Sequence, residues 1–179
     1  MLARRWCAVL FSVSIGCSCA LDAQQQQQPS SCAARVPANI DAGLFERDVM
    51  TLAGRSETFR SQCDRLAQAT NLRVRIEMAI DLDNGRAQTA IHRQTSGAIE
   101  ADVAVLFGEN YRELLAHEFE HILEQVEGVN LRAEAARGRA WMLPGGFFET
   151  RRAFTTGMQV LREAESAHAR GLVAVHATR

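Results

Sequence analysis

The fold is decided by one stretch, Leu114-Leu115-Ala116-His117-Glu118-Phe119-Glu120-His121-Ile122-Leu123-Glu124-Gln125. Its apolar residues recur at spacings of three and four, and neither Pro nor Gly follows before Gly128, so the pattern predicts an α-helix. His117 and His121 then lie one turn apart on the same face. Two imidazoles in this arrangement can bind one Zn²⁺ ion. The alternative is an amphipathic helix that carries two histidines by chance.

Glu118 directly follows the first histidine, in the pattern H-E-x-x-H. A carboxylate at this position can approach a water molecule on the metal from the side, without being a metal ligand itself. The motif therefore predicts that Glu118 is the catalytic residue, acting as a general base.

This motif, HEFEH, resembles that of the zincin metallopeptidases, whose fold places an HExxH helix beside a small β-sheet. The longer metzincin pattern is absent, because Glu124 stands where that pattern has Gly and Glu127 stands where it has a third His. The resemblance is thus to the gluzincin-like arrangement, in which a Glu on a later helix is the third ligand. It implies an α+β fold with a zincin-like core, a Zn²⁺ cofactor, and a peptide or protein substrate.

The third ligand that the resemblance implies is Glu149. It follows His121 by 28 residues and stands at the start of a long helix predicted over 148–170. Ala153 and Gly157 come one and two turns later on the same face, and such small residues allow a close approach to the histidine helix. The run F-E-T-x-x-A-x-x-x-G resembles the third-ligand helix of small gluzincin-like proteins. The alternative is that Glu149 only stabilises the N-terminus of its own helix.

Other side chains compete for the role of third ligand. Glu124 is too near His121 on the same helix to complete a tetrahedral site easily, and His168 lies ~28 Å from Glu149 along one straight helix. The competitors are Glu124, Glu127, Glu134, Glu163, Glu165, His168 and His176. A donor for the oxyanion is also undecided, with Tyr111, Arg151 and Arg152 as candidates.

The N-terminus has the features of a signal peptide over residues 1–23. Two adjacent arginines precede an apolar run that is too short to span a bilayer, and Ala23 is the candidate cleavage position. Two alternatives stay open, a retained membrane anchor and lipid attachment at Cys17. We expect export to the periplasm or the medium, with a membrane partner only if Cys17 is lipidated.

The rest of the chain is expected to form one domain. Residues 24–38 begin with five consecutive Gln and are predicted to be a flexible polar linker, followed by a single domain over 39–179. Hydrophobic residues make up 47% of the 179 residues and charged residues 23%, which suits one globular core. The formal net charge is −1 and the arginines form no stripe, so nucleic acid is not expected as a partner.

Three of the five cysteines lie in the predicted signal peptide. The other two, Cys32 and Cys63, form an even pair that would meet an oxidising compartment after export. We expect a disulfide that ties the N-terminal arm to an early helix. The alternative is two buried free thiols.

Helical and strand patterns alternate along the domain. Helices are expected at 41–53 and 56–69, as an N-terminal helical hairpin, and at 131–137, with an apolar loop at 141–148.

Strand patterns fill the segment before the motif. They occur at 72–78, 86–94 and 98–107, with Asp83-Asn84-Gly85 as a hairpin turn. We expect a small antiparallel three-stranded sheet packed against the HExxH helix and the long C-terminal helix. By resemblance, 98–107 is the candidate edge strand for an extended peptide substrate, and the alternative is a purely structural strand.

The sequence therefore predicts zinc-dependent hydrolysis of peptide bonds by an exported metallopeptidase. His117, His121 and Glu149 are the predicted metal ligands, and Glu118 is the predicted general base. The alternative is a non-catalytic zincin-fold protein of the cell envelope with a binding or structural role, in the form of a lipoprotein if Cys17 carries a lipid.

Overall fold

The structure is a computed structural model that describes residues 31–82, 85–108 and 110–177. The predicted signal peptide, Cys17 and the Gln run lie outside the described residues, as do Asp83 and Asn84 of the predicted turn. Among the residues that are described, no helix is both long enough and apolar enough to cross a bilayer.

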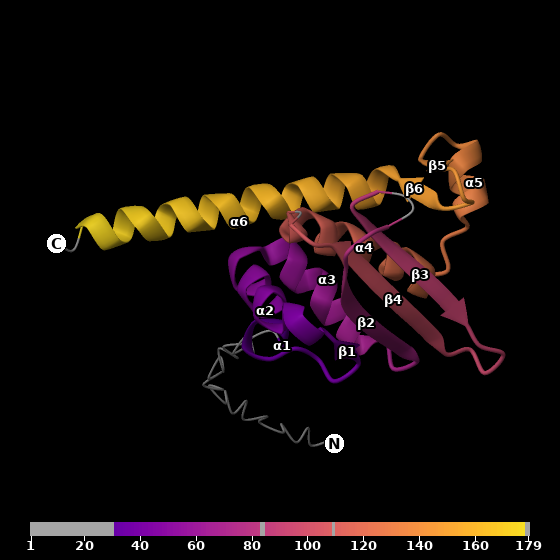
Figure 1. Cartoon of the computed structure of the whole chain (residues 1–179), viewed down its shortest axis with the longest axis horizontal. Coiled ribbons are helices and arrows are strands. Elements are labelled where there is room, and N and C mark those ends of the chain that lie inside the picture. The colour runs from indigo at the N-terminus through magenta and orange to yellow at the C-terminus, as the bar shows by residue number, and fades with distance from the viewer. Residues whose placement is uncertain (1–30, 83–84, 109, 178–179) are drawn as a thin grey trace, which may run out of the picture.

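The described residues form a mixed α+β fold, which confirms the α+β class but not the zincin-like core (Figure 1). The helices are α1 (Ser31–Ala34), α2 (Glu46–Arg55), α3 (Glu57–Gln68), α4 (Tyr111–Val126), α5 (Leu131–Ala136) and α6 (Arg151–Ala177), with a 3-10 turn η1 (Gly43–Phe45). The strands are β1 (Ile40–Asp41), β2 (Leu72–Ala79), β3 (Ala87–Arg93), β4 (Ile99–Leu106), β5 (Ala140–Met142) and β6 (Phe148–Thr150).

The larger sheet has four strands in the order β1-β2-β4-β3. Strand β2 is parallel to β4, β1 is parallel to β2, and only β3 is antiparallel to its neighbour. The prediction of an antiparallel three-stranded sheet is therefore wrong, although the three predicted strands exist. The reason is burial: β2 and β4 each bury every second residue along most of their length, so they form the centre, whereas the half-buried β3 lies at the edge. The prediction that 98–107 is the edge strand is wrong for the same reason.

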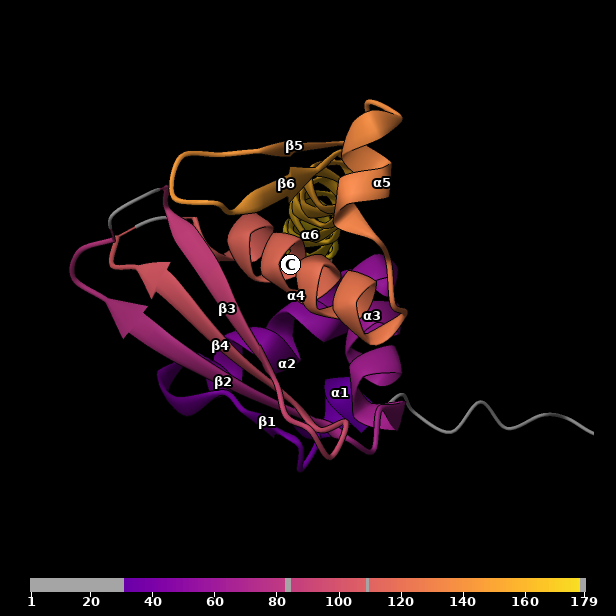
Figure 2. The same cartoon turned by 90° about the vertical axis from the view of Figure 1, so that its right-hand side faces the viewer.

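Helix α4 lies between the sheet and α6 (Figures 1 and 2). Leu115, Phe119 and Ile122 of α4 are fully buried in the main core. Phe119 stacks on Phe59 of α3, with 5.2 Å between ring centroids. Each of these large side chains stabilises the fold by roughly 1.5–3 kcal/mol through burial. The motif helix is therefore held rigidly from its apolar side, and its polar side is left to build a site.

The N-terminal helices are anchored to this core. Ser56 caps α3 by accepting a hydrogen bond from Phe59 N at 3.0 Å, and the predicted pair of helices is present as α2 and α3. Cys32 and Cys63 are paired at disulfide distance, with 6.0 Å between their Cα atoms, as predicted. Cys32 is fully buried and lies in α1, so packed structure extends into the segment predicted as a linker.

The segment predicted as an apolar loop forms a β-hairpin, β5–β6, instead. Gly145 and Gly146 both have positive φ, which supplies the turn, and Leu143 N donates to Phe147 O at 2.7 Å. Helix α6 begins at Arg151, not at 148, so the placement of Glu149 on this helix is wrong. Glu149 lies on strand β6, opposite Trp141 of β5.

Candidate metal centre

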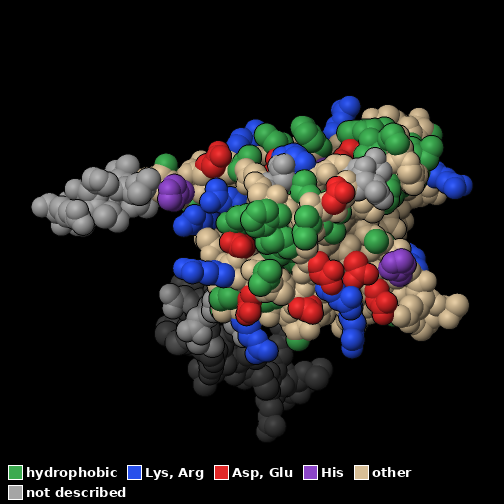
Figure 3. All heavy atoms as spheres, in the orientation of Figure 1, with side chains coloured by type: hydrophobic (Ala, Val, Ile, Leu, Met, Phe, Trp, Pro, Cys, Tyr) green, Lys and Arg blue, Asp and Glu red, His purple; other side chains and the backbone are tan. Residues whose placement is uncertain are grey.

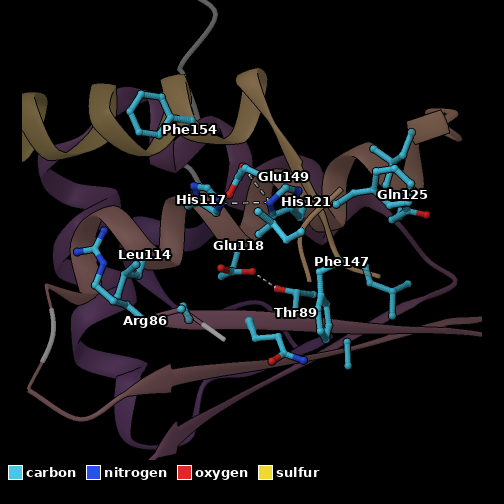
Figure 4. Close-up of a pocket in the computed structure, with 18 of the residues that line it drawn as sticks. Arg86, Thr89, Leu114, His117, Glu118, His121, Gln125, Phe147, Glu149 and Phe154 are labelled. Carbon is cyan, nitrogen blue, oxygen red and sulfur yellow. Dashed lines mark hydrogen bonds and ion pairs between the residues drawn. The ribbon is translucent and has the colours of Figure 1, made fainter. Parts of the chain in front are cut away.

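His117 and His121 of α4 meet Glu149 of β6 at one point (Figure 4). The two histidine Nε2 atoms are 3.1 Å apart. Glu149 Oε2 lies 3.1 Å from His117 Nε2, and Glu149 Oε1 lies 3.6 Å from His121 Nε2. One ligand atom from each of the three residues lies within 4.8 Å of the others, so this group could hold a metal ion. The structure thus brings together the three predicted ligands.

Close packing of α6 on α4 brings Glu149 to the histidines. A Cβ atom on Gly157 would lie 3.0 Å from Glu113 O and 3.3 Å from His117 Cβ, so only a glycine fits there without a shift. Ala153, one turn earlier, is fully buried. The prediction that small residues let the two helices approach is therefore confirmed.

A carboxylate on α4 orients the second histidine. Glu124 Oε2 lies 3.1 Å from His121 Nδ1, and Glu124 Oε1 accepts a hydrogen bond from Thr150 Oγ1 at 2.8 Å. Thr150 also caps α6 by accepting from Ala153 N at 3.0 Å. Glu124 thus fixes the ring so that Nε2 faces Glu149, as such carboxylates do at metal sites. Sequence reasoning did not select this residue, although its spacing of three from His121 on the helix is a usable signal.

The protonation of the metal-free cluster follows from its charges. Burial disfavours the protonated form of His121, but hydrogen bonds to Glu124 and Glu149 and the charge of Glu118 outweigh burial and raise its pKa to about 10. For Glu149, burial favours the neutral acid, yet hydrogen bonds to His117 and His121 lower its pKa to about 2. The cluster therefore holds a proton on His121 at neutral pH, and a metal cation would replace it.

Glu118 is buried, and one of its oxygens is held by the neighbouring strand. Thr89 Oγ1 of β3 donates to Glu118 Oε2 at 2.6 Å, and both residues line the same cavity as the histidines (Figure 4). The hydrogen bond fixes the side-chain rotamer of Glu118. Sequence reasoning missed Thr89, because no local pattern in a strand shows which helix residue it faces.

The cavity has a volume of about 590 Å³ and lies between β3, α4 and the β5–β6 hairpin. One wall is the backbone and side chains of β3, including Thr89 and Ile91. Apolar side chains from the β5–β6 hairpin and from α6 complete the lining, namely Leu143, Phe147 and Phe154. The site can therefore take a ligand much larger than a water molecule or a metal ion.

Most competing ligands are engaged elsewhere. Glu127 pairs with Arg65 and Arg152, Glu134 with Arg137 and Arg139, and Glu163 accepts from Ser56 and Thr58. Glu165 and His168 are exposed further along α6, and the side chain of His176 lies outside the described part.

Two of the three candidate oxyanion donors, Arg152 and Tyr111, make contacts elsewhere. Arg152 pairs with Glu120 at 2.5 Å, and the Tyr111 ring packs against Phe45 with 6.4 Å between centroids. Arg151 is exposed at the first residue of α6, and none of the three lines the cavity.

No protein-family model, curated protein or solved structure matches this chain.

Proposed function

We propose that this chain is a zinc-dependent peptidase, with His117, His121 and Glu149 as the metal ligands and Glu118 as the general base. One observation carries the proposal: Glu118 lines the same cavity as the three ligand side chains but is not part of their cluster. A purely structural metal site has no use for a carboxylate beside it that stays outside the coordination sphere. The buried pair of Cys32 and Cys63 supports export, because disulfides persist in oxidising compartments.

The spacing of the ligand atoms suits zinc. Zinc binds His nitrogen and carboxylate oxygen at roughly 2.0–2.1 Å in a tetrahedron, whose ligand–ligand edges are then about 3.3–3.4 Å. The three observed separations are 3.1, 3.1 and 3.6 Å. Two imidazoles and one carboxylate also form a typical catalytic zinc set, which leaves the fourth position for water or substrate.

Each residue of the site has a separate role in the proposed hydrolysis. When bound, zinc supplies Lewis acidity, which polarises a peptide carbonyl and makes a water molecule acidic at about pH 7. Glu118 takes the proton of the attacking water and then delivers it to the leaving amine. Thr89 holds the Glu118 carboxylate in place, and Glu124 holds His121. Because these side chains are fixed before the substrate arrives, little reorganisation is needed in the transition state.

Strand β3 and the apolar side chains that line the cavity indicate which class of substrate the site can bind. Within the described residues, the sheet order leaves the outer edge of β3 without a partner strand, and residues 87–91 of this strand line the cavity. An extended peptide can pair with such an edge through its backbone. Apolar side chains also line the cavity, Leu143 and Phe147 from the β5–β6 hairpin and Phe154 from α6. We therefore propose an extended peptide with a large apolar residue beside the cleaved bond.

A second candidate is a non-catalytic metal-binding protein of the envelope. It is favoured by one observation, namely that Tyr111, Arg151 and Arg152 all lie outside the cavity lining, so that none of them supplies the oxyanion donor.

The substitution Glu118→Gln separates the two candidates. For a peptidase, turnover of a peptide library should fall by about 10²–10⁴-fold, because the general base is lost, while zinc content stays unchanged. Glu46→Gln, which changes an exposed acid of α2, is the matched control and should leave both properties unchanged. Equal turnover in Glu118→Gln and the parent chain would exclude Glu118 as the base, and no turnover in the zinc-loaded parent would favour the binding protein.

A further inference from the structure

A second hollow, of about 500 Å³, lies where α2 and α3 meet α6. Its lining shares no residue with the metal cavity. We call it the arginine pocket, because it is lined by Arg55, Arg60, Arg162 and Arg170, together with Gly54, Glu57, Glu163 and Ser166. Figure 3 shows basic side chains beside α6 on the visible face. Arg162 follows Phe154, the residue of α6 that lines the metal cavity, by eight residues, or roughly 12 Å along the helix.

The positive charge of the pocket is only partly neutralised from within the fold. Arg55 and Arg60 are half-buried and Arg162 and Arg170 are exposed, and in the described residues none of the four forms an ion pair. Arg60 does donate to Ala53 O at 3.2 Å. Four guanidinium groups therefore stand against two carboxylates in the lining.

One of these two carboxylates is already occupied. Glu163 accepts hydrogen bonds from Ser56 Oγ at 2.6 Å, Thr58 N at 3.0 Å and Thr58 Oγ1 at 2.7 Å. It thereby caps the N-terminus of α3 rather than pairing with an arginine. The α3 terminus itself is thus satisfied, so the attraction for an anion comes from the arginines alone.

We propose that the arginine pocket binds a compound that carries at least two clustered phosphate groups. A guanidinium group binds phosphate through two parallel N–H···O bonds, and four guanidinium groups suffice for two phosphates. The hollow is larger than one phosphate ion, and its lining contains no aromatic side chain on which a base could stack. Soluble polyphosphate compounds and the headgroups of diphosphate lipids share this chemistry.

The test is calorimetric titration of the full chain with inorganic triphosphate, with and without EDTA because triphosphate also chelates metals. The parent chain should bind, with an affinity that falls as salt rises. Arg162→Gln should weaken binding about tenfold and Arg55→Gln/Arg162→Gln about a hundredfold, since each change removes a charge-assisted contact. The affinity of Arg162→Lys should lie between those of the parent chain and Arg162→Gln, because lysine keeps the positive charge but cannot form two parallel hydrogen bonds to one phosphate.

The matched control is Arg73→Gln, which removes one exposed arginine from β2, outside the pocket. If it weakens binding as much as Arg162→Gln, attraction by overall charge explains the result and the pocket is refuted. Absence of binding at low salt, or equal binding by the double variant, also refutes it.

Vesicles of phosphatidylcholine with and without cardiolipin then separate the two sources of phosphate. Retention that depends on both cardiolipin and Arg162 supports a lipid headgroup. Binding of triphosphate alone supports a soluble compound.

Discussion

Helix α4 carries charge on two sides, and the two sides neutralise it differently. On the side that faces α3 and the start of α6, the buried Glu120 lies 2.5 Å from Arg152 and accepts a hydrogen bond from Gln62 Nε2 at 2.6 Å. A guanidinium group is protonated at every physiological pH. This side therefore holds a permanent ion pair that links α4 to α6, and the hydrogen bond from Gln62 links α4 to α3.

On the cavity side, the carboxylates meet imidazoles instead. Three acids surround two histidines, namely Glu118, Glu124 and Glu149 around His117 and His121. An imidazole is a cation only when it is protonated, and its proton can be exchanged for a metal ion. One helix thus contributes a permanent salt bridge on one side and a cluster that can exchange a proton for a metal ion on the other, and we expect substitutions on the two sides to affect different properties.

The largest effect on stability is expected from Arg152→Ala. It leaves Glu120, whose side chain is only 4% exposed, without its cation. We expect the free energy of unfolding to fall by about 3 kcal/mol, measured by chemical denaturation, because a buried charge loses its partner. Zinc affinity of the folded protein should stay unchanged. A loss of zinc affinity as large as the loss of stability would break the distinction between the two sides.

Zinc affinity should rise with pH. In the metal-free protein the pKa of His121 is raised from 6.5 to about 10, so the ring is protonated at neutral pH and zinc must displace that proton. The affinity should therefore increase about tenfold per pH unit between about pH 7 and about pH 10, as competition titrations with a chelator can measure. Glu124→Gln removes one cause of the raised pKa, so the increase in affinity should level off at a lower pH. A flat dependence in the parent chain would contradict the proton exchange.

A smaller effect is expected where α6 touches the cavity side of α4. Gly157→Ala places a methyl group 3.0 Å from Glu113 O and 3.3 Å from His117 Cβ. We expect a loss of about 1–2 kcal/mol in the free energy of unfolding, because overpacking outweighs the gain in helix propensity. Zinc affinity should fall as well, because His117 shifts. Gly54→Ala is the control: its Cβ meets nothing within 4 Å, so it should stabilise α2 by up to about 1 kcal/mol.

The smallest effect is expected at Glu163 of α6, which accepts hydrogen bonds at the N-terminus of α3. Burial raises the pKa of this acid, but hydrogen bonds from Ser56, Thr58 and Gln159 outweigh burial and lower it from 4.5 to about 2. Its contribution to stability is therefore complete above about pH 4.5 and is lost as the pH falls through about 2. Glu163→Gln should cost about 1 kcal/mol at neutral pH, a figure reduced for solvent screening, and nothing near pH 2. Denaturation curves of this variant and of Glu165→Gln, an exposed acid on α6, test this pH window.

The sequence predicted the elements of the fold better than their pairing. The alternation of apolar and polar residues predicted β2 and β4, whose residues are alternately buried, and the apolar spacing predicted helix α4. Pairing depends on which strands bury the most apolar surface together, and the turn signal at Asp83-Asn84-Gly85 suggested a local hairpin instead. Strand β3 comes between β2 and β4 in the sequence, yet in the sheet β4 lies between β2 and β3. No local sequence pattern encodes this order.

For the site, the spacing of residues along one helix was sufficient to predict which side chains share a face. The spacing between elements was not sufficient to predict which element carries the third ligand. The placement of His117 and His121 follows from the helical period. Glu149 was selected through a resemblance to a third-ligand helix, yet it reaches the histidines from β6. Thr89 comes from another strand and was not predicted, since contact between a strand and a helix depends on tertiary packing.

If His117, His121 and Glu149 bind one zinc ion, the zinc content of the purified chain depends on each of them. The purified chain, saturated with zinc and then desalted, should retain one zinc ion per molecule by elemental analysis. Glu149→Ala should retain almost none, and Glu120→Gln, on the other side of α4, should retain one. Equal zinc content in Glu149→Ala and the parent chain would show that Glu149 is not a zinc ligand.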